Sequence, residues 1–289
     1  MSTEAAAITS GSLARWRGWR ARPRAVIVFT VLLLGGITMV MPILFMLSTS
    51  FKYAHEVYDL NLIPREPTLD NYLQLFEESA FIRWFANSFL VATVSTVSVV
   101  FFDSLVGYTL CKFRFRGRGL VFIGILSTLM IPTEMLVIPW YVMGRQLGWL
   151  NSYWGIMFPG MITAFGVFLM RQFFETVPDD FIDAARIDGL NEFEIWWHVA
   201  MPLVTPAMSA LAIFNFLGNW TAFLWPLIAI SNNGLFTLPV GLASFAGEFR
   251  TEWQMIMAGA AVATIPTLVV FILFQRYIVR GVMLAGVKG

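Results

Sequence analysis

Apolar stretches of about twenty residues recur along the chain from residue 25 almost to its end. An α-helix rises about 1.5 Å per residue, so a stretch of this length crosses the roughly 30 Å hydrocarbon core of a bilayer. The composition agrees, because 58% of the 289 residues are hydrophobic and only 13% are charged. The sequence therefore predicts an all-α, polytopic membrane protein. Six transmembrane helices are expected, at Ala25–Ser48, Asn87–Cys111, Leu120–Met143, Tyr153–Met170, Ala207–Ser231 and Met255–Gln275.

The Lys and Arg residues are distributed unevenly between the two sides of this predicted membrane domain. Fourteen of the nineteen lie before span one, between spans two and three, between spans four and five, or after span six. Cytosolic segments retain excess positive charge during insertion, so both termini are predicted to be cytosolic. The expected domains are a basic cytosolic segment at 1–24, a membrane domain at 25–277 and a cytosolic tail at 278–289.

A polar loop at about 174–205 separates spans four and five on the predicted cytosolic side. It is too long for a minimal helix connection. Asp179 or Asp180 is expected to cap the first turn of a helix, since the free N–H groups there need an acceptor. Gly189 is expected to end this helix, because glycine adopts the left-handed conformation at low cost.

A second helix is expected to start at Asn191, where Glu194 completes a capping-box pattern. It is expected to end before Pro202, which cannot continue a regular helix. Glu192 is expected on its solvent side. The loop is therefore predicted to be a helix, a sharp turn and a second helix, all outside the membrane.

The first of these helices carries two adjacent alanines, which would allow the backbone of a partner to approach closely. The neighbouring charged side chains would fix the register of such a contact. An amphipathic helix that rests on the bilayer surface is the alternative, and the residues alone do not separate the two interpretations. The expected face combines Phe181, Ala184, Ala185 and Asp188, with Asp183 and Arg186 beside it.

The stretch DAARIDGLNEFEIWWHVAMPL resembles the EAA loop of ABC-importer permeases, in which E-A-A is followed by D-G and, after a spacer, by a proline. In that family the first helix of the loop sits in a cleft on the ATPase subunit and transmits its closure to the membrane helices. Here an aspartate stands where the family usually has glutamate. The matching positions are Asp183, Ala184, Ala185, Asp188, Gly189 and Pro202.

Nearly the whole chain resembles a narrower group, the carbohydrate importers, and specifically the smaller permease subunit of the maltose-type transporter. In WTAFLWPL, Thr221 and Ala222 replace the polar pair of the family phrase, so the resemblance does not carry a solute contact over to those two positions. The phrases that carry the resemblance are PTLDNYLQLF, WFANSFLVA, FRFRGRGL, MIPTEMLVIPWY, LNSYWGIMFPG, TLPVGL and GVMLAGVKG.

This resemblance implies a type I ABC-importer permease in the bacterial inner membrane, working with a second homologous permease, an ATPase dimer and an external solute-binding protein. ATP and Mg would bind to the ATPase partner. A sugar or sugar-derived solute would pass between the two permeases, although this chain is a poor guide to which one. The family tail reaches into the ATPase interface, which implies that role for Gly286, Val287, Lys288 and Gly289.

Several polar residues fall inside the predicted spans. Asp103 and Glu134 are the only residues there with a formal charge, and Pro132 is expected to bend the helix next to Glu134. Asn215 and Asn219 lie one helical turn apart on span five. Each of these side chains either lines the solute pathway or forms an interhelical hydrogen bond, and the sequence leaves both interpretations open.

Other classes of function lack support in the sequence. None of the three lysines precedes Ser or Thr, as the P-loop of an ATPase requires. His55 and His198 lie far apart on opposite sides of the predicted membrane, so they are not expected to form a metal site with Cys111. No catalytic triad or cluster of ionisable residues is visible, so no enzyme active site or cofactor site is expected in this chain. The distribution of basic residues implies no nucleic-acid face. An ion-gradient-driven transporter or passive channel is the alternative function, but its ion site and inverted repeats are not visible. The sequence favours a permease subunit of an ATP-driven importer.

Overall fold

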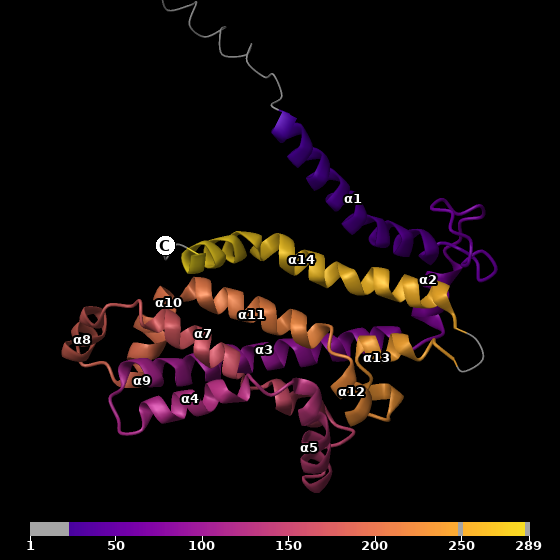
Figure 1. Cartoon of the computed structure of the whole chain (residues 1–289). Helices are drawn as coiled ribbons and strands as arrows, with labels where there is room; N and C mark the ends of the chain where they lie inside the picture. Colours follow the sequence, from indigo (N-terminus) through magenta and orange to yellow (C-terminus); the bar gives the residue numbers. More distant parts are fainter. Residues whose placement is uncertain (1–22, 248–250, 287–289) are drawn as a thin grey trace, which may run out of the picture.

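The protein, described here by a computed structural model, is almost entirely helical over the described residues, 23–247 and 251–286 (Figure 1). Side chains are described over 26–247 and 251–274. Three helices are long and apolar enough to cross a bilayer unbroken: α1 (Pro23–Ser50), α3 (Phe81–Lys112) and α14 (Trp253–Gly286).

Three further helix pairs pass the same test as bent spans, so the described residues provide up to six spans, as predicted. The first pair is α4 (Arg118–Thr128) and α5 (Thr133–Gln146), bent by 100°. The second is α6 (Tyr153–Met157) with the 3-10 turn η2 (Phe158–Gly160), followed at 44° by α7 (Ala164–Phe174). The third is the helical segment Glu192–Leu203, followed at 86° by α11 (Thr205–Trp220).

Span three is not the continuous helix that the sequence predicts over Leu120–Met143. Helix α4 ends at Thr128, and α5 begins only after Pro132. A proline lacks an N–H donor and disfavours helical geometry in the residue before it. The bend expected near Glu134 is therefore confirmed, and at 100° it is a complete break.

Span five also differs from its predicted range, Ala207–Ser231. Helix α11 ends at Trp220, and a separate helix α12 (Leu224–Ala229) follows. Pro226 explains the break, because its ring would clash with an earlier carbonyl in a continuous helix. In α12 it occupies the first turn, where the backbone N–H has no intrahelical partner.

Helix α3 packs against both α7 and α11, while α14 packs on α11 and on α1. The other helices lie at the two ends of this bundle in Figure 1. One end holds the loop helices α8 (Asp179–Ile187), α9 (Glu192–Glu194) and α10 (Met201–Leu203), and the other holds α2 (Asp70–Glu77), α12 and α13 (Leu238–Ala243).

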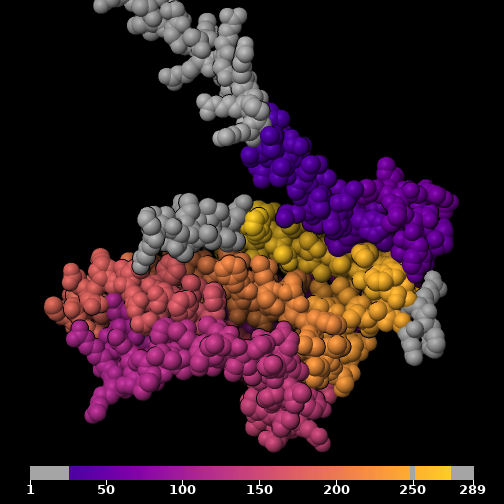
Figure 2. All heavy atoms as spheres, in the orientation of Figure 1, coloured from indigo at the N-terminus to yellow at the C-terminus, as the bar shows by residue number. Residues whose placement is uncertain are grey.

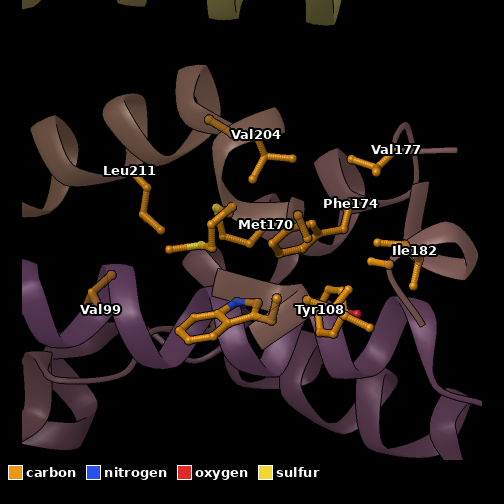
Figure 3. Packing of buried hydrophobic residues seen from close by; sticks show 14 residues of the cluster. Val99, Tyr108, Met170, Phe174, Val177, Ile182, Val204 and Leu211 are labelled. Carbon is orange, nitrogen blue, oxygen red and sulfur yellow. The ribbon is translucent and has the colours of Figure 1, made fainter. Parts of the chain in front are cut away.

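Buried apolar side chains form a core at the loop end of the bundle. Figure 3 shows Ile182 of α8 close to Phe174 of α7 and Tyr108 of α3. In contrast, all the described side chains of α1 as far as Leu44 are exposed, and the first half of this helix stands away from the body in Figure 2. This apolar surface suits lipid or another membrane subunit.

Candidate functional site

The loop between α7 and α11 has the predicted helix, turn and helix. Helix α8 ends at Ile187, and Gly189 adopts the left-handed conformation with φ of +86°. The N–H of Gly189 donates to the carbonyl of Arg186, and the N–H of Leu190 donates to the carbonyl of Ala185. These two bonds form a Schellman motif, which confirms the predicted role of Gly189.

The start of α8 is built differently from the prediction. Pro178 holds the N-cap position without a side-chain bond, so neither Asp179 nor Asp180 caps the helix. Instead, Nζ of Lys112, at the end of α3, donates to the Asp179 carboxylate and to the Val177 carbonyl, both at 2.6 Å. This hydrogen bond from Lys112 lowers the pKa of Asp179. The Lys112 side chain is only 6% exposed, so a nearly buried cation joins α8 to α3.

The second half of the loop confirms the capping box. Oδ1 of Asn191 accepts from the N–H of Glu194 at 3.0 Å, and Oε2 of Glu194 accepts from the N–H of Asn191 at 2.9 Å. The predicted end before Pro202 is wrong, because helical geometry continues through a π-helical turn, Ile195–Ala200, to Leu203. Pro202 lies in the last turn of this helical segment, and only Leu203 follows it there.

One residue of the outer face predicted on α8, Ala185, is wrongly placed there. Ala185 is buried with Ile182, three residues earlier, in the core at the loop end of the bundle. Ala184 remains exposed, as do Phe181 and Ile187, which are 53% and 87% exposed. Helical periodicity does not determine which face of a short helix meets the core, so the sequence did not separate buried Ala185 from the outer face or indicate that Ile187 belongs to it.

Arg186 is the centre of a polar network beside that outer face. Its Nε donates to Oε1 of Glu192 at 2.7 Å, and its Nη1 donates to Oδ1 of Asp183 at 2.8 Å. The bond to Glu192 raises the pKa of Arg186. Tyr108 of α3 donates to Oε2 of Glu192 at 3.4 Å. The Glu192 side chain is 40% exposed, so its predicted solvent side is correct only in part, because both carboxylate oxygens are paired with other side chains.

The predicted polar residues of the spans occupy different settings. Nδ2 of Asn219 donates to the carbonyl and to Oδ1 of Asn215, and Thr96 of α3 donates to the same Oδ1 at 3.3 Å. Asp103 is fully buried and forms interhelical hydrogen bonds to Thr163. Glu134 is exposed in the first turn of α5, at the break of span three.

The residues predicted to reach the ATPase interface, 286–289, lie mostly outside the residues that the structure describes. Gly286 is the last residue of α14, and Val287, Lys288 and Gly289 lie outside the described residues.

Comparison with known proteins identifies the family. A family model described as "Binding-protein-dependent transport system inner membrane component" matches residues 103–284, which include the whole α8 loop. The chain belongs to this family. It is thus an inner-membrane permease, and the predicted family resemblance is confirmed.

Relatives of this permease match it over most of their length. The arabinooligosaccharides transport system permease protein AraQ of Bacillus subtilis (strain 168) is 35% identical over 253 residues, covering 86% of this chain and 90% of AraQ. The lactose transport system permease protein LacG of Rhizobium radiobacter is 32% identical over 269 residues, covering 93% and 98%.

The fold of this permease has also been seen in a solved structure. That structure is a bacterial ABC transporter involved in the import of the acidic polysaccharide alginate. One of its chains superposes with a TM-score of 0.77 at 26% identity, covering 88% of the permease and 96% of that chain.

Proposed function

We propose that this permease forms half of the translocation pathway of an ATP-driven, binding-protein-dependent importer for a sugar or sugar-derived solute. A second homologous permease would supply the other half, and an external solute-binding protein would deliver the solute. The names of the relatives, which specify arabinooligosaccharides, lactose and alginate, support this class of solute. Asn215, Asn219 and Glu134 are the proposed pathway residues of this chain.

The α8 loop is the proposed contact with the ATPase dimer, and one observation carries this proposal. Helix α8, outside the spans, presents exposed apolar side chains, Phe181 and Ile187, while Ile182 and Ala185 pack its other face into the core. An exposed apolar surface held in a fixed geometry is typical of a docking element. Asp183, Arg186 and Asp188 would form its polar rim, while Gly189 and Pro202 shape the loop.

ATP and Mg would bind to the ATPase partner, and residues 286–289 of this chain would reach the interface of that dimer. The chain itself lacks the Gly-Lys-Ser/Thr sequence of a P-loop. Because ATP would bind only to the partner, ATP hydrolysis by the purified proteins tests the proposal directly.

Reconstitution of the permease provides that experiment. Alone in nanodiscs, the chain is expected to hydrolyse no ATP. With its partner permease and ATPase it is expected to show hydrolysis that the loaded binding protein raises. The solute is chosen first by a thermal-shift screen of the binding protein with arabinotriose, lactose and alginate oligosaccharides. Robust hydrolysis by the permease alone, or ion-driven sugar uptake by it in liposomes, would contradict the proposal.

Both termini and the α8 loop are proposed to face the cytosol, as the distribution of basic residues indicates. Single cysteines at Thr3, Asn191 and Val287, in a Cys111→Ala background, are expected to resist an impermeant maleimide in intact cells. A cysteine at Tyr58, in the loop between α1 and α2, is the matched control. It is expected to be labelled, because this side chain is 76% exposed and the loop lies at the opposite end of the bundle from α8. Ready labelling at Asn191 would reverse the topology.

A further inference from the structure

The break in span four lies between η2 and α7, at residues 161–163. A broken helix frees backbone N–H and C=O groups, and in hydrocarbon each such group is costly unless the protein supplies a partner. The break therefore persists only if neighbouring side chains satisfy those groups.

Helix α3 supplies a partner on each side of this break. Oγ of Ser98 donates to the carbonyl of Met161 at 2.8 Å. On the other side, the N–H of Thr163 donates to Oδ1 of Asp103 at 3.0 Å, and its hydroxyl donates to Oδ2 at 2.6 Å. The same hydroxyl accepts from the N–H of Gly166 at 3.0 Å, which caps α7. Two residues of one helix thus bind the two ends of the break in another.

Asp103 acts only as an acceptor in these contacts. Both of its oxygens accept from Thr163, and the carboxyl group lies at the N-terminal end of α7, where a negative charge is favoured. Gly166 leaves room for it, since a Cβ atom there would overlap the Asp103 carboxylate.

We propose that Ser98 and Asp103 are positioning residues that hold span four broken, so that the η2 turn stays against Asn219 of α11. A Cβ atom on Gly160 would lie 3.1 Å from Oδ1 of Asn219, so the turn and the asparagine are already in close contact. Without the two α3 side chains, continuing the helix through residues 161–163 is the cheapest way to satisfy the freed backbone groups in hydrocarbon. That change would rotate Gly160 away from Asn219.

Cross-linking tests the position of the turn without any solute or ATPase. Gly160→Cys and Asn219→Cys are introduced together in a Cys111→Ala background, which removes the single native cysteine. Membranes are oxidised with copper phenanthroline, and protection from PEG-maleimide after denaturation gives the disulfide fraction. The pair is expected to oxidise readily, because the Cγ position of residue 219 lies 3.9 Å from a Cβ atom at Gly160.

Adding Asp103→Leu with Thr163→Val is expected to lower the disulfide fraction about fivefold, and Ser98→Ala is expected to lower it less. The double variant removes the Thr163 hydroxyl and the Asp103 carboxyl together, so neither side chain is left as an unpaired buried polar group. The disulfide fraction is expressed per inserted chain, because the N–H groups of Thr163 and Gly166 also lose their acceptors. Thr163→Ser, which keeps the hydroxyl, is expected to retain the cross-link. This last variant separates loss of the contact from loss of bulk.

A second cysteine pair controls for general disruption. Thr96→Cys with Asn215→Cys joins α3 to α11, whose packing does not depend on the break, and the side-chain oxygens at these positions lie 3.3 Å apart. This control disulfide is expected to form equally in every variant. An unchanged cross-link between residues 160 and 219 in the Asp103→Leu/Thr163→Val and Ser98→Ala chains would overturn the proposal. Any effect on transport rests on the proposed function, whereas this cross-link does not.

Discussion

Gly189→Val is expected to insert into the membrane at wild-type abundance and to lose most transport and most of the ATPase stimulation by loaded binding protein. At φ of +86° a residue with a Cβ atom costs about 1–2 kcal/mol, and a β-branched one costs more. The Schellman motif that ends α8 would open to relieve this strain, and the exposed face of α8 would shift. Uptake of labelled solute by proteoliposomes, together with ATP hydrolysis, measures the effect.

The open surroundings of Gly189 separate the effect of backbone strain from that of a steric clash. A Cβ atom there would meet nothing within 4 Å, so a loss of function would not come from a clash inside the chain.

Gly117, in the turn between α3 and α4, has the same φ of +86° and equally open surroundings. Gly117→Val therefore imposes the same strain in a turn that is not part of α8, and it is expected to retain most activity. Gly189→Asn is expected to be mild, since asparagine tolerates the left-handed region. Equal losses from both valine variants would remove α8 from the coupling role.

Features set by local sequence were predictable for this permease. The six apolar stretches, the turn at Gly189 and the capping box of Asn191 with Glu194 all depend on residues within a few positions of each other. The family resemblance of the loop is local too, and the family match over residues 103–284 confirms it.

Features set by contacts between distant residues were not predictable. Tyr108 meets Glu192 although 84 residues separate them, and Lys112 meets Asp179 across 67 residues. Which face of α8 is buried depends on the side chains of α3 and α7 that receive it, so periodicity alone placed Ala185 outside. The pairing of Asp103 with the break in span four depends on packing in the same way.

Lys112→Met is expected to reduce ATPase stimulation by about tenfold while leaving insertion intact. The methionine keeps most of the apolar stem of the lysine, but it removes the donor that binds the Val177 carbonyl and the Asp179 carboxylate. A hydrogen bond to a charged group contributes about 1.5–3 kcal/mol, and the nearly buried position of Lys112 protects the bond to Val177 from screening. Without it, α8 can move relative to α3, so closure of the ATPase would displace the loop and not the membrane helices.

Asp179→Asn separates the two bonds of Lys112. The Asp179 side chain is 72% exposed, so its ion pair is screened and the variant is expected to retain most stimulation, because the bond to Val177 remains. The pKa of Asp179 is lowered in the folded protein, so its pairing contributes above the ordinary value of 3.8 and is lost only as the pH falls through the lowered value. Stimulation measured between about pH 6 and 8 should therefore not depend on this group. If Asp179→Asn were as damaging as Lys112→Met, the surface ion pair, and not the buried bond to Val177, would anchor α8.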